Sequence, residues 1–398
     1  MDVIRNYPEL VKASAIQPAS GKRLLFIDNL RWLIIVMVVL VHLNVTYGNI
    51  GGWYYYEKGG WDIFSKIIFV MFGSFNQAYF MGFLFFIAGY FVPGSLERKG
   101  IFRFIGERLV RLGIPTILFM LLLHPLTILI IQAFHHDVPP HLSAIYIKYL
   151  TSFEFIGSSG PLWFAFALLI FSGFYTLVKL FFVKNSLFQR NQIDCRITHF
   201  KVGSIVILIT GVTFLVRWVQ PIGTAFYNMQ LCFFPQYVVL FILGLHAYRY
   251  HWLAEVPYSF GITWFKIALF FGIPFWIMVV IFGRALQDIT SFYGGIHWQA
   301  AAYAFWESLF CVGVCLGLLV LFREKNNNQG PISHFLSENA FAVYIFHTPL
   351  LVFVTMIFRP FRIYPLLKMW WVAIIVLPLC FGFSHCIRKI PWMKKLFS

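Results

Sequence analysis

Three ionisable side chains lie inside one long apolar segment of the chain. The segment runs from Leu24 to Tyr47 with the sequence LLFIDNLRWLIIVMVVLVHLNVTY, and it contains Asp28, Arg31 and His42. A run of this length can cross a bilayer, where charged side chains are costly and therefore usually functional. Arg31 and His42 are thus the first candidates for chemistry.

The spacing of Arg31 and His42 predicts that both side chains lie on one face of a helix. They are eleven residues apart, which on a helix is three turns plus about 20° and roughly 16 Å along the axis. If the helix enters the membrane near Leu25, Arg31 lies close to the first interface and His42 about 25 Å from the entry point, toward the far interface. An arginine binds anions and an imidazole exchanges protons near neutral pH. The pattern therefore predicts a site that extends through the membrane.

A second basic pair occurs in the segment ERKGIFRFIGERLVRLGIP, residues 97–115. Arg108 and Arg111 are neighbours on one helix face, a spacing that suits the binding of a phosphate or pyrophosphate. Basic residues at the end of a membrane span also serve as anchors in the lipid head groups. The spacing by itself leaves both interpretations open.

The composition indicates the class of protein that contains these residues. Of the 398 residues, 60% are hydrophobic and only 12% are charged, with a mean hydropathy of +0.77. Soluble domains contain about 45 to 50% apolar residues, so we predict an all-α, polytopic membrane helix bundle. The net charge of +16 lies in short segments between apolar runs, which argues against a nucleic-acid-binding surface. The six cysteines show no zinc-ligand spacing, and we expect no metal.

Hydropathy predicts about ten membrane spans in a single domain of residues 24–388. They lie near residues 25–47, 65–92, 112–134, 160–183, 202–219, 231–248, 264–283, 300–322, 339–358 and 368–387. The second contains Gly73, Gly82 and the polar residues Asn76 and Gln77, so we expect it to be broken or to begin as an interfacial helix. Residues 1–23 contain no apolar signal-peptide core and form a predicted cytoplasmic stub. Residues 389–398 form a predicted basic cytoplasmic tail.

The distribution of lysine and arginine predicts the orientation of the bundle. With the N-terminus inside the cell, the cytoplasmic segments hold twenty of these residues and the opposite loops hold six. Cytoplasmic loops are enriched in lysine and arginine. Both termini are therefore expected in the cytoplasm.

Two of these segments resemble a known family. IDNLRWLIIVMVVLVHL is similar to the opening helix of the membrane-bound acyltransferase 3 family, whose signature is an arginine, ten residues and a histidine, here Arg31 and His42. RLVRLGIP is similar to the family's RxxR motif and its following proline, with Arg108 and Arg111 as the two arginines. The resemblance runs from the first span to the last, so it implies an acyltransferase domain over residues 24–388.

Other segments resemble the family more weakly. FFIAGYF is similar to its FFxxSGYF motif, with Ala88 in place of serine. The segments PLWF, which contains Trp163, and NAFAVYIFHTPLL, which contains His347, are also similar. GERLVRLGIP resembles the branch that includes glucan succinyltransferases, although the acyl group stays open between acetyl and succinyl.

The resemblance implies transfer of an acyl group from cytoplasmic acyl-CoA to a hydroxyl of an envelope glycan or glycolipid. The co-substrate would be acetyl-CoA or succinyl-CoA, whose phosphates would contact Arg31, Arg108 and Arg111. His42 would act as general base on the hydroxyl or form an acyl-imidazole intermediate, and both routes stay open. We expect such an enzyme in a bacterial inner membrane, with the lipid bilayer, acyl-CoA and the glycan as partners. The sequence does not indicate an oligomeric state.

Two further ionisable residues lie inside predicted spans. Glu307 is the one carboxylate well inside a span, where it would orient His42 or accept a sugar hydroxyl. Its alternative role is a structural pair with Arg217 or Arg31. His347 is either a catalytic residue of the site or a histidine of the core.

Several side chains are candidates for binding the acceptor or the transition state. The loop GGWYYYEKGGW contains Trp53 and Trp61, whose flat rings suit stacking on sugars but also occur in interfacial belts. Asn76 and Gln77 are the nearest polar candidates to stabilise a transient oxyanion. Trp163 is placed with these substrate-binding candidates because of the family-like PLWF segment.

A secondary transporter is the main alternative from another class. Intramembrane arginine, histidine and glutamate residues also mark substrate and proton paths. The chain shows no repeated halves, and the basic RxxR at the mouth of the third span favours an enzyme.

Overall fold

Ten helices of membrane-spanning length form the structure, which is a computed structural model. It describes residues 23–59, 62–136, 139, 141–182 and 196–397. Helix makes up 82% of it, and none of the described residues belongs to a strand. Ten helical segments are long and apolar enough to cross a membrane. The prediction of an all-α membrane bundle with about ten spans is thus confirmed.

The spans agree with the predicted ranges and extend beyond most of their ends. They are α2 (Leu25–Gly48), α3 (Ile63–Lys99), α4 to α6 (Ile101–His135), η5 with α8 (Gly160–Phe181), α9 (His199–Val219), η7 with α10 (Leu231–Arg249), α12 with α13 (Tyr258–Phe282), α15 (Trp298–Lys325), α16 (Pro331–Phe358) and α17 (Pro365–Arg388). Four short α-helices and one 3-10 helix of the described residues lie outside them: α7 (Leu142–Thr151), η4 (Glu154–Gly157), α11 (Trp252–Glu255), α14 (Thr290–Tyr293) and α18 (Pro391–Phe397).

Helix α3 is one continuous helix of 37 residues, so the predicted break is wrong, while the interfacial start stays a prediction. At about 1.5 Å per residue it is longer than the roughly 30 Å hydrocarbon layer. The Asp62 carboxylate caps it by accepting a hydrogen bond from the Ser65 backbone N–H at 2.9 Å. This bond and a second from the Ser65 hydroxyl lower the pKa of Asp62 to about 2. The cap explains why the helix begins before the predicted apolar run.

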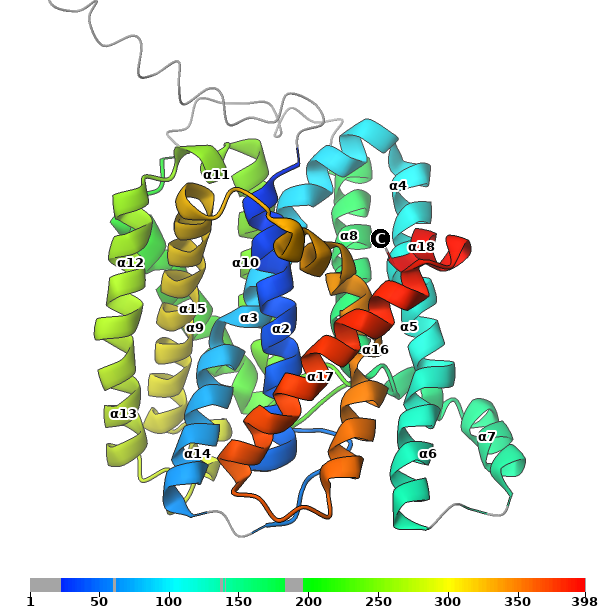
Figure 1. Ribbon diagram of the computed structural model, residues 1–398. Coiled ribbons are helices and arrows are strands. Elements are labelled where there is room, and N and C mark those ends of the chain that lie inside the picture. Colours follow the sequence, from blue (N-terminus) through cyan, green and yellow to red (C-terminus); the bar gives the residue numbers. More distant parts are fainter. Residues whose placement is uncertain (1–22, 60–61, 137–138, 140, 183–195, 398) are drawn as a thin grey trace, which may run out of the picture.

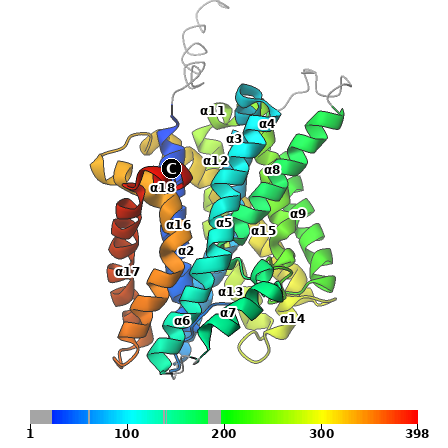
Figure 2. The same cartoon turned by 90° about the vertical axis from the view of Figure 1, so that its right-hand side faces the viewer.

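Helix α2 runs through the middle of the bundle, in contact with α3, α15, α16 and α17 (Figure 1). Figure 2 shows α16 and α17 on one side of the molecule and α8 and α9 on the other. Helices α3 and α10 pack closely, and a Cβ on Gly89 would lie 2.3 Å from the Phe241 carbonyl oxygen. Small residues permit such close approach in membranes.

The two ends of α2 define the two ends of the bundle. The end where α2 begins holds Arg31, Arg108 and Arg111 and is called the arginine end; the opposite one, with the loop after α2 and with α7, is called the loop end (Figure 1). Residues 1–22 of the predicted stub lie outside the described residues. The predicted tail contains α18, whose Phe397 is fully buried with its ring 5.2 Å from that of Phe346. The chain after α17 therefore packs against the bundle.

Candidate active site

Two histidines and a tryptophan meet near the loop end of α2. His42 of α2 lies with its Nδ1 3.2 Å from Nε2 of His347 on α16. The Trp53 ring, from the loop after α2, stacks on His42 with ring centroids 4.0 Å apart and an interplanar angle of 25°. Three predicted site residues are thus brought together from two helices and a loop. Trp61, predicted with Trp53, lies outside the described residues.

The hydrogen bonds of His347 define which ring nitrogens carry protons. Its Nδ1 lies 2.8 Å from the backbone oxygen of Tyr344 and 3.2 Å from that of Val343. Because a carbonyl oxygen only accepts, Nδ1 of His347 must carry the proton. In the neutral ring Nε2 is then an acceptor, so Nδ1 of His42 donates to it. In a neutral His42 ring with its proton on Nδ1, the other nitrogen, Nε2, carries a lone pair and can accept a proton.

Three predicted arginines line one cavity at the arginine end. Arg31, Arg108 and Arg111 contribute to a cavity of about 2250 Å³. The Arg31 guanidinium lies 4.8 Å from the centroid of the Phe91 ring, and that of Arg108 lies 5.1 Å from the Phe104 ring. The aromatic rings support the two cations without neutralising them. A cluster of guanidinium groups on an open cavity is suited to a phosphate-bearing ligand.

The cavity becomes apolar as it extends into the bundle. Its inner wall includes Ile35, Leu84, Ala88, Phe164 and Tyr344. The Tyr344 ring lies 6.4 Å from the ring of His347, centroid to centroid. The cavity therefore comes within one helical turn of His347, although His42 does not line it.

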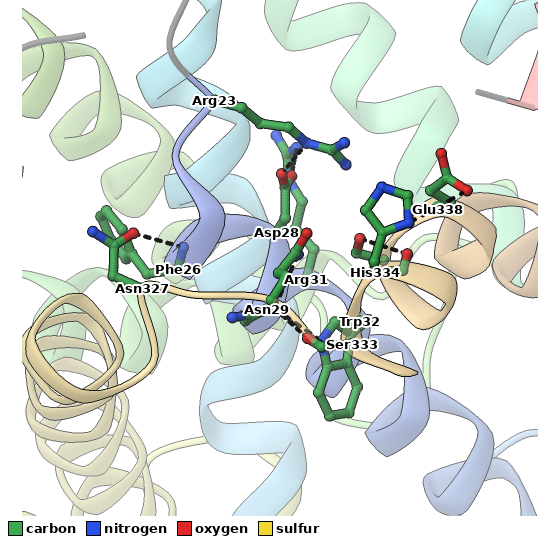
Figure 3. Close-up of polar contacts among 12 residues, drawn as sticks. Arg23, Phe26, Asp28, Asn29, Arg31, Trp32, Asn327, Ser333, His334 and Glu338 are labelled. Atoms are coloured by element: carbon green, nitrogen blue, oxygen red, sulfur yellow. Dashed lines mark hydrogen bonds and ion pairs between the residues drawn. The ribbon is translucent and has the colours of Figure 1, made fainter. Parts of the chain in front are cut away.

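A carboxylate holds Arg31 at the mouth of the cavity. Asp28 accepts a hydrogen bond from Arg31 at 3.3 Å and is also paired with Arg23. Figure 3 shows both arginines beside the Asp28 carboxylate. Asp28 thereby holds the guanidinium groups of Arg23 and Arg31 close to the start of α2.

The start of α2 is tied to the α15–α16 loop by Asn29, a contact that sequence reasoning missed. The Asn29 amide donates to the backbone oxygens of Asn326 and Asn328, at 2.7 and 2.9 Å. Its side-chain oxygen accepts from the Ser333 hydroxyl at 2.6 Å (Figure 3). The signal was a polar Asp-Asn pair beside Arg31, but its partners lie about 300 residues away along the chain.

A π-helical turn positions Arg111. The turn spans Leu109–Gly113 and ends two residues before Pro115. Proline has no N–H, and its ring clashes with the carbonyl four residues earlier, which here belongs to Arg111. The wider π turn relieves this clash, and such turns are frequent at functional sites.

Glu307 forms a buried ion pair with Arg217. Its Oε2 is 2.6 Å from Nη2 of Arg217, and the two side chains are 3% and 0% exposed. Among the described residues, no hydrogen bond joins Glu307 to His42. The geometry is the structural pair with Arg217 that was one of the two alternatives for Glu307. Buried charges need such pairing.

Among the described residues, the contacts of Asn76, Gln77 and Trp163 are with residues other than His42. The Asn76 amide donates to the Phe72 backbone oxygen at 2.8 Å, and the Gln77 amide donates to the Tyr237 hydroxyl at 3.1 Å. The Trp163 ring stacks near Tyr237 with centroids 5.7 Å apart. Gln77 and Trp163 thus share one aromatic partner inside the bundle, and Asn76 bonds to the preceding turn of its own helix.

A tyrosine–histidine contact at the loop end was also missed by sequence reasoning. The Tyr54 hydroxyl lies 2.7 Å from Nδ1 of His124, and the Tyr149 ring is stacked at 6.0 Å from that of His124. Burial raises the pKa of Tyr54, so its hydroxyl stays protonated and can donate. No group of three or more metal-binding side chains occurs among the described residues.

Comparison with known proteins gives one match. A family model described as an acyltransferase domain matches residues 24–388. The matched range begins one residue before α2 and ends at the last residue of α17, so it contains all ten long helices, the arginine-lined cavity and the histidine pair. No curated protein and no solved structure matches the chain.

Proposed function

Because the chain belongs to the acyltransferase 3 family, we propose that this membrane acyltransferase moves an acyl group from acyl-CoA to a hydroxyl of an envelope glycan or glycolipid. The observation that carries the proposal is the arrangement along α2. Arg31 lies on the cavity at one end and His42 contacts His347 toward the other. An anion-binding mouth and a proton acceptor are the two parts that such a transfer needs.

The cavity supports acyl-CoA as the donor. Arg31, Arg108 and Arg111 would bind its phosphates through charge-assisted hydrogen bonds. The apolar inner wall would take the pantetheine arm and direct the thioester toward the histidine pair. The arginine end would face the cytoplasm, where acyl-CoA is made, in agreement with the lysine and arginine distribution. The acyl group would be acetyl or succinyl.

His42 would act as the general base through its Nε2. It would take the proton of the acceptor hydroxyl as the oxygen attacks the thioester carbonyl carbon, the carbon–sulfur bond breaks, and the CoA sulfur receives the proton. His347 would be a positioning residue, since it holds the proton on Nδ1 of His42. General base catalysis contributes about 10² to 10⁴ in rate. An acyl-imidazole route would use the same Nε2 lone pair.

The transferase activity is tested by replacing His42 with Gln, which keeps polar bulk but cannot accept a proton near neutral pH. Purified protein in proteoliposomes receives labelled acetyl-CoA or succinyl-CoA and an envelope glycan extract, and the label on the glycan is measured. We expect transfer by the parent, a loss of at least about 10² in the His42→Gln variant, and unchanged acyl-CoA binding. His199→Asn, at an exposed histidine of α9, is the control.

Two outcomes contradict the proposal. Near-parental transfer by His42→Gln would remove His42 from the chemistry. Uptake of a solute into the vesicles without CoA, together with no acylated glycan from either donor, would favour the transporter alternative.

A further inference from the structure

Residues 49–59, the described part of the loop after α2, cover the histidine pair. Trp53 lies 4.0 Å from His42, and its ring is within 13° of parallel to that of His347. Figure 1 shows this loop at the lower end of the bundle, below the last turn of α2. One face of the His42 ring is therefore shielded by an indole that comes from outside the helices.

A buried ion pair holds the loop in this position. Glu57 of the loop lies with Oε1 2.6 Å from Nζ of Lys368 in the first turn of α17. The Lys368 side chain is only 1% exposed, and its Nζ also donates to the Phe361 backbone oxygen at 2.8 Å. Lysine is rarely buried to this degree unless it is paired. The pair therefore fixes the loop to a transmembrane helix that carries none of the proposed catalytic residues.

Short hydrogen bonds transmit this restraint from Glu57 to Trp53. The Glu57 backbone N–H donates to the Thr46 backbone oxygen of α2 at 2.9 Å. The Asn49 side-chain amide donates to the Glu57 backbone oxygen at 3.1 Å. The Trp53 backbone N–H donates to the Tyr56 hydroxyl at 2.7 Å. Both ends of the loop segment around Trp53 are thus anchored to α2, and Glu57 is the residue that also reaches α17.

We propose that Glu57 and Lys368 are positioning residues that hold Trp53 over His42 as a cover, and that the cover keeps water from the acyl donor. This inference rests on the proposed transferase function. Water competes with the acceptor hydroxyl: its oxygen attacks the thioester carbonyl carbon, the carbon–sulfur bond breaks, and a carboxylic acid and the CoA thiol are released. As general base, His42 would be able to deprotonate either nucleophile, so selection for the hydroxyl needs the exclusion of water. The acceptor would reach His42 by displacing Trp53.

The test measures release of CoA thiol from acetyl-CoA or succinyl-CoA in proteoliposomes without any acceptor. The variants are Trp53→Ala, Trp53→Phe and the double variant Glu57→Gln/Lys368→Met, which removes both charges and so leaves no unpaired buried charge. We expect Trp53→Ala and the double variant to raise release roughly three- to tenfold, the factor expected when one aromatic contact is lost. Trp53→Phe keeps an aromatic ring at this position and should raise release less than Trp53→Ala.

Two controls separate the cover from a general loss of structure. Lys66→Met changes an exposed lysine at the same end of the bundle and should leave release unchanged. Adding His42→Gln to Trp53→Ala should abolish the extra release, because the hydrolysis uses the same base. Hydrogen exchange followed by mass spectrometry reads the loop directly: amides of residues 49–57 should exchange faster in the double variant than in the parent.

The outcomes distinguish this inference from the proposed function. Unchanged exchange in the double variant would show that the ion pair does not hold the loop and would overturn the inference. Faster exchange with unchanged CoA release, in protein that still acylates the glycan extract, would overturn the cover and leave the transferase in place. No acyl transfer by the parent with either donor would refute the proposed function and, with it, the cover.

Discussion

Replacing His347 tests the proton assignment in the histidine pair. His347→Leu removes the Nε2 acceptor that lies 3.2 Å from Nδ1 of His42. The His42 ring is then free to place its proton on either nitrogen and to rotate about its own bonds. His347→Gln is the matched variant, because its amide oxygen can accept the same N–H.

The expected loss follows from what the bond contributes. One net hydrogen bond is worth about 0.5–1.5 kcal/mol, which corresponds to about a two- to thirteen-fold change in rate. Loss of the carboxylate that orients the histidine of a Ser-His-Asp triad costs about 10⁴, but His347 is a neutral partner. We therefore expect His347→Leu to lower kcat about two- to thirteen-fold and His347→Gln, which keeps an acceptor, to lower it less.

The assay is the initial rate of label transfer from acyl-CoA to glycan extract at several donor concentrations. KM for acyl-CoA should not change, since Arg31 is roughly 16 Å from His42 along α2. Thermal unfolding of both variants checks that the buried site still folds. Equal activity of the Leu and Gln variants, with unfolding like that of the parent, would refute hydrogen-bond acceptance as the role of His347.

Three further predictions follow from other parts of the bundle. Replacing Arg108 and Arg111 with Gln should weaken acyl-CoA binding about tenfold or more per residue, and added salt should weaken binding to the parent in a titration; unchanged affinity would support the lipid-anchor interpretation. A reporter fused after Ser398 should be active only in the cytoplasm, and a signal from the opposite side would overturn the proposed orientation. Glu307→Gln should lower stability by about 3–5 kcal/mol because it leaves Arg217 as an unpaired buried charge, as measured by thermal unfolding, and parental stability would argue against a structural pair.

Buried ionisable residues have two different roles in this bundle, a structural one and a proposed chemical one. Arg217 and Glu307 are as buried as His347, but their contacts are with each other. His347 instead contacts a residue of the family signature. Burial therefore does not distinguish the role of Glu307 from that of His347. The difference lies in their partners, which are Arg217 for Glu307 and His42 for His347.

The sequence alone determined the class of fold and the two ends of the candidate site. Apolar runs of spanning length predict helices because a bilayer leaves backbone groups no partner outside the helix, so ten spans could be placed without tertiary information. The spacing of Arg31 and His42 fixed their common face on α2 for the same local reason. The RxxR and the arginine–histidine signature were equally local patterns.

Only the tertiary structure decided which distant residues share a site. The contact of His347 with His42 joins residues 305 positions apart, and that of Lys368 with Glu57 joins residues 311 apart. No periodicity within one helix encodes such pairings, since they depend on how whole helices pack. Glu307 shows the same limit: its charge was visible in the sequence, but its choice of Arg217 over His42 follows from the packing of α15 against α9.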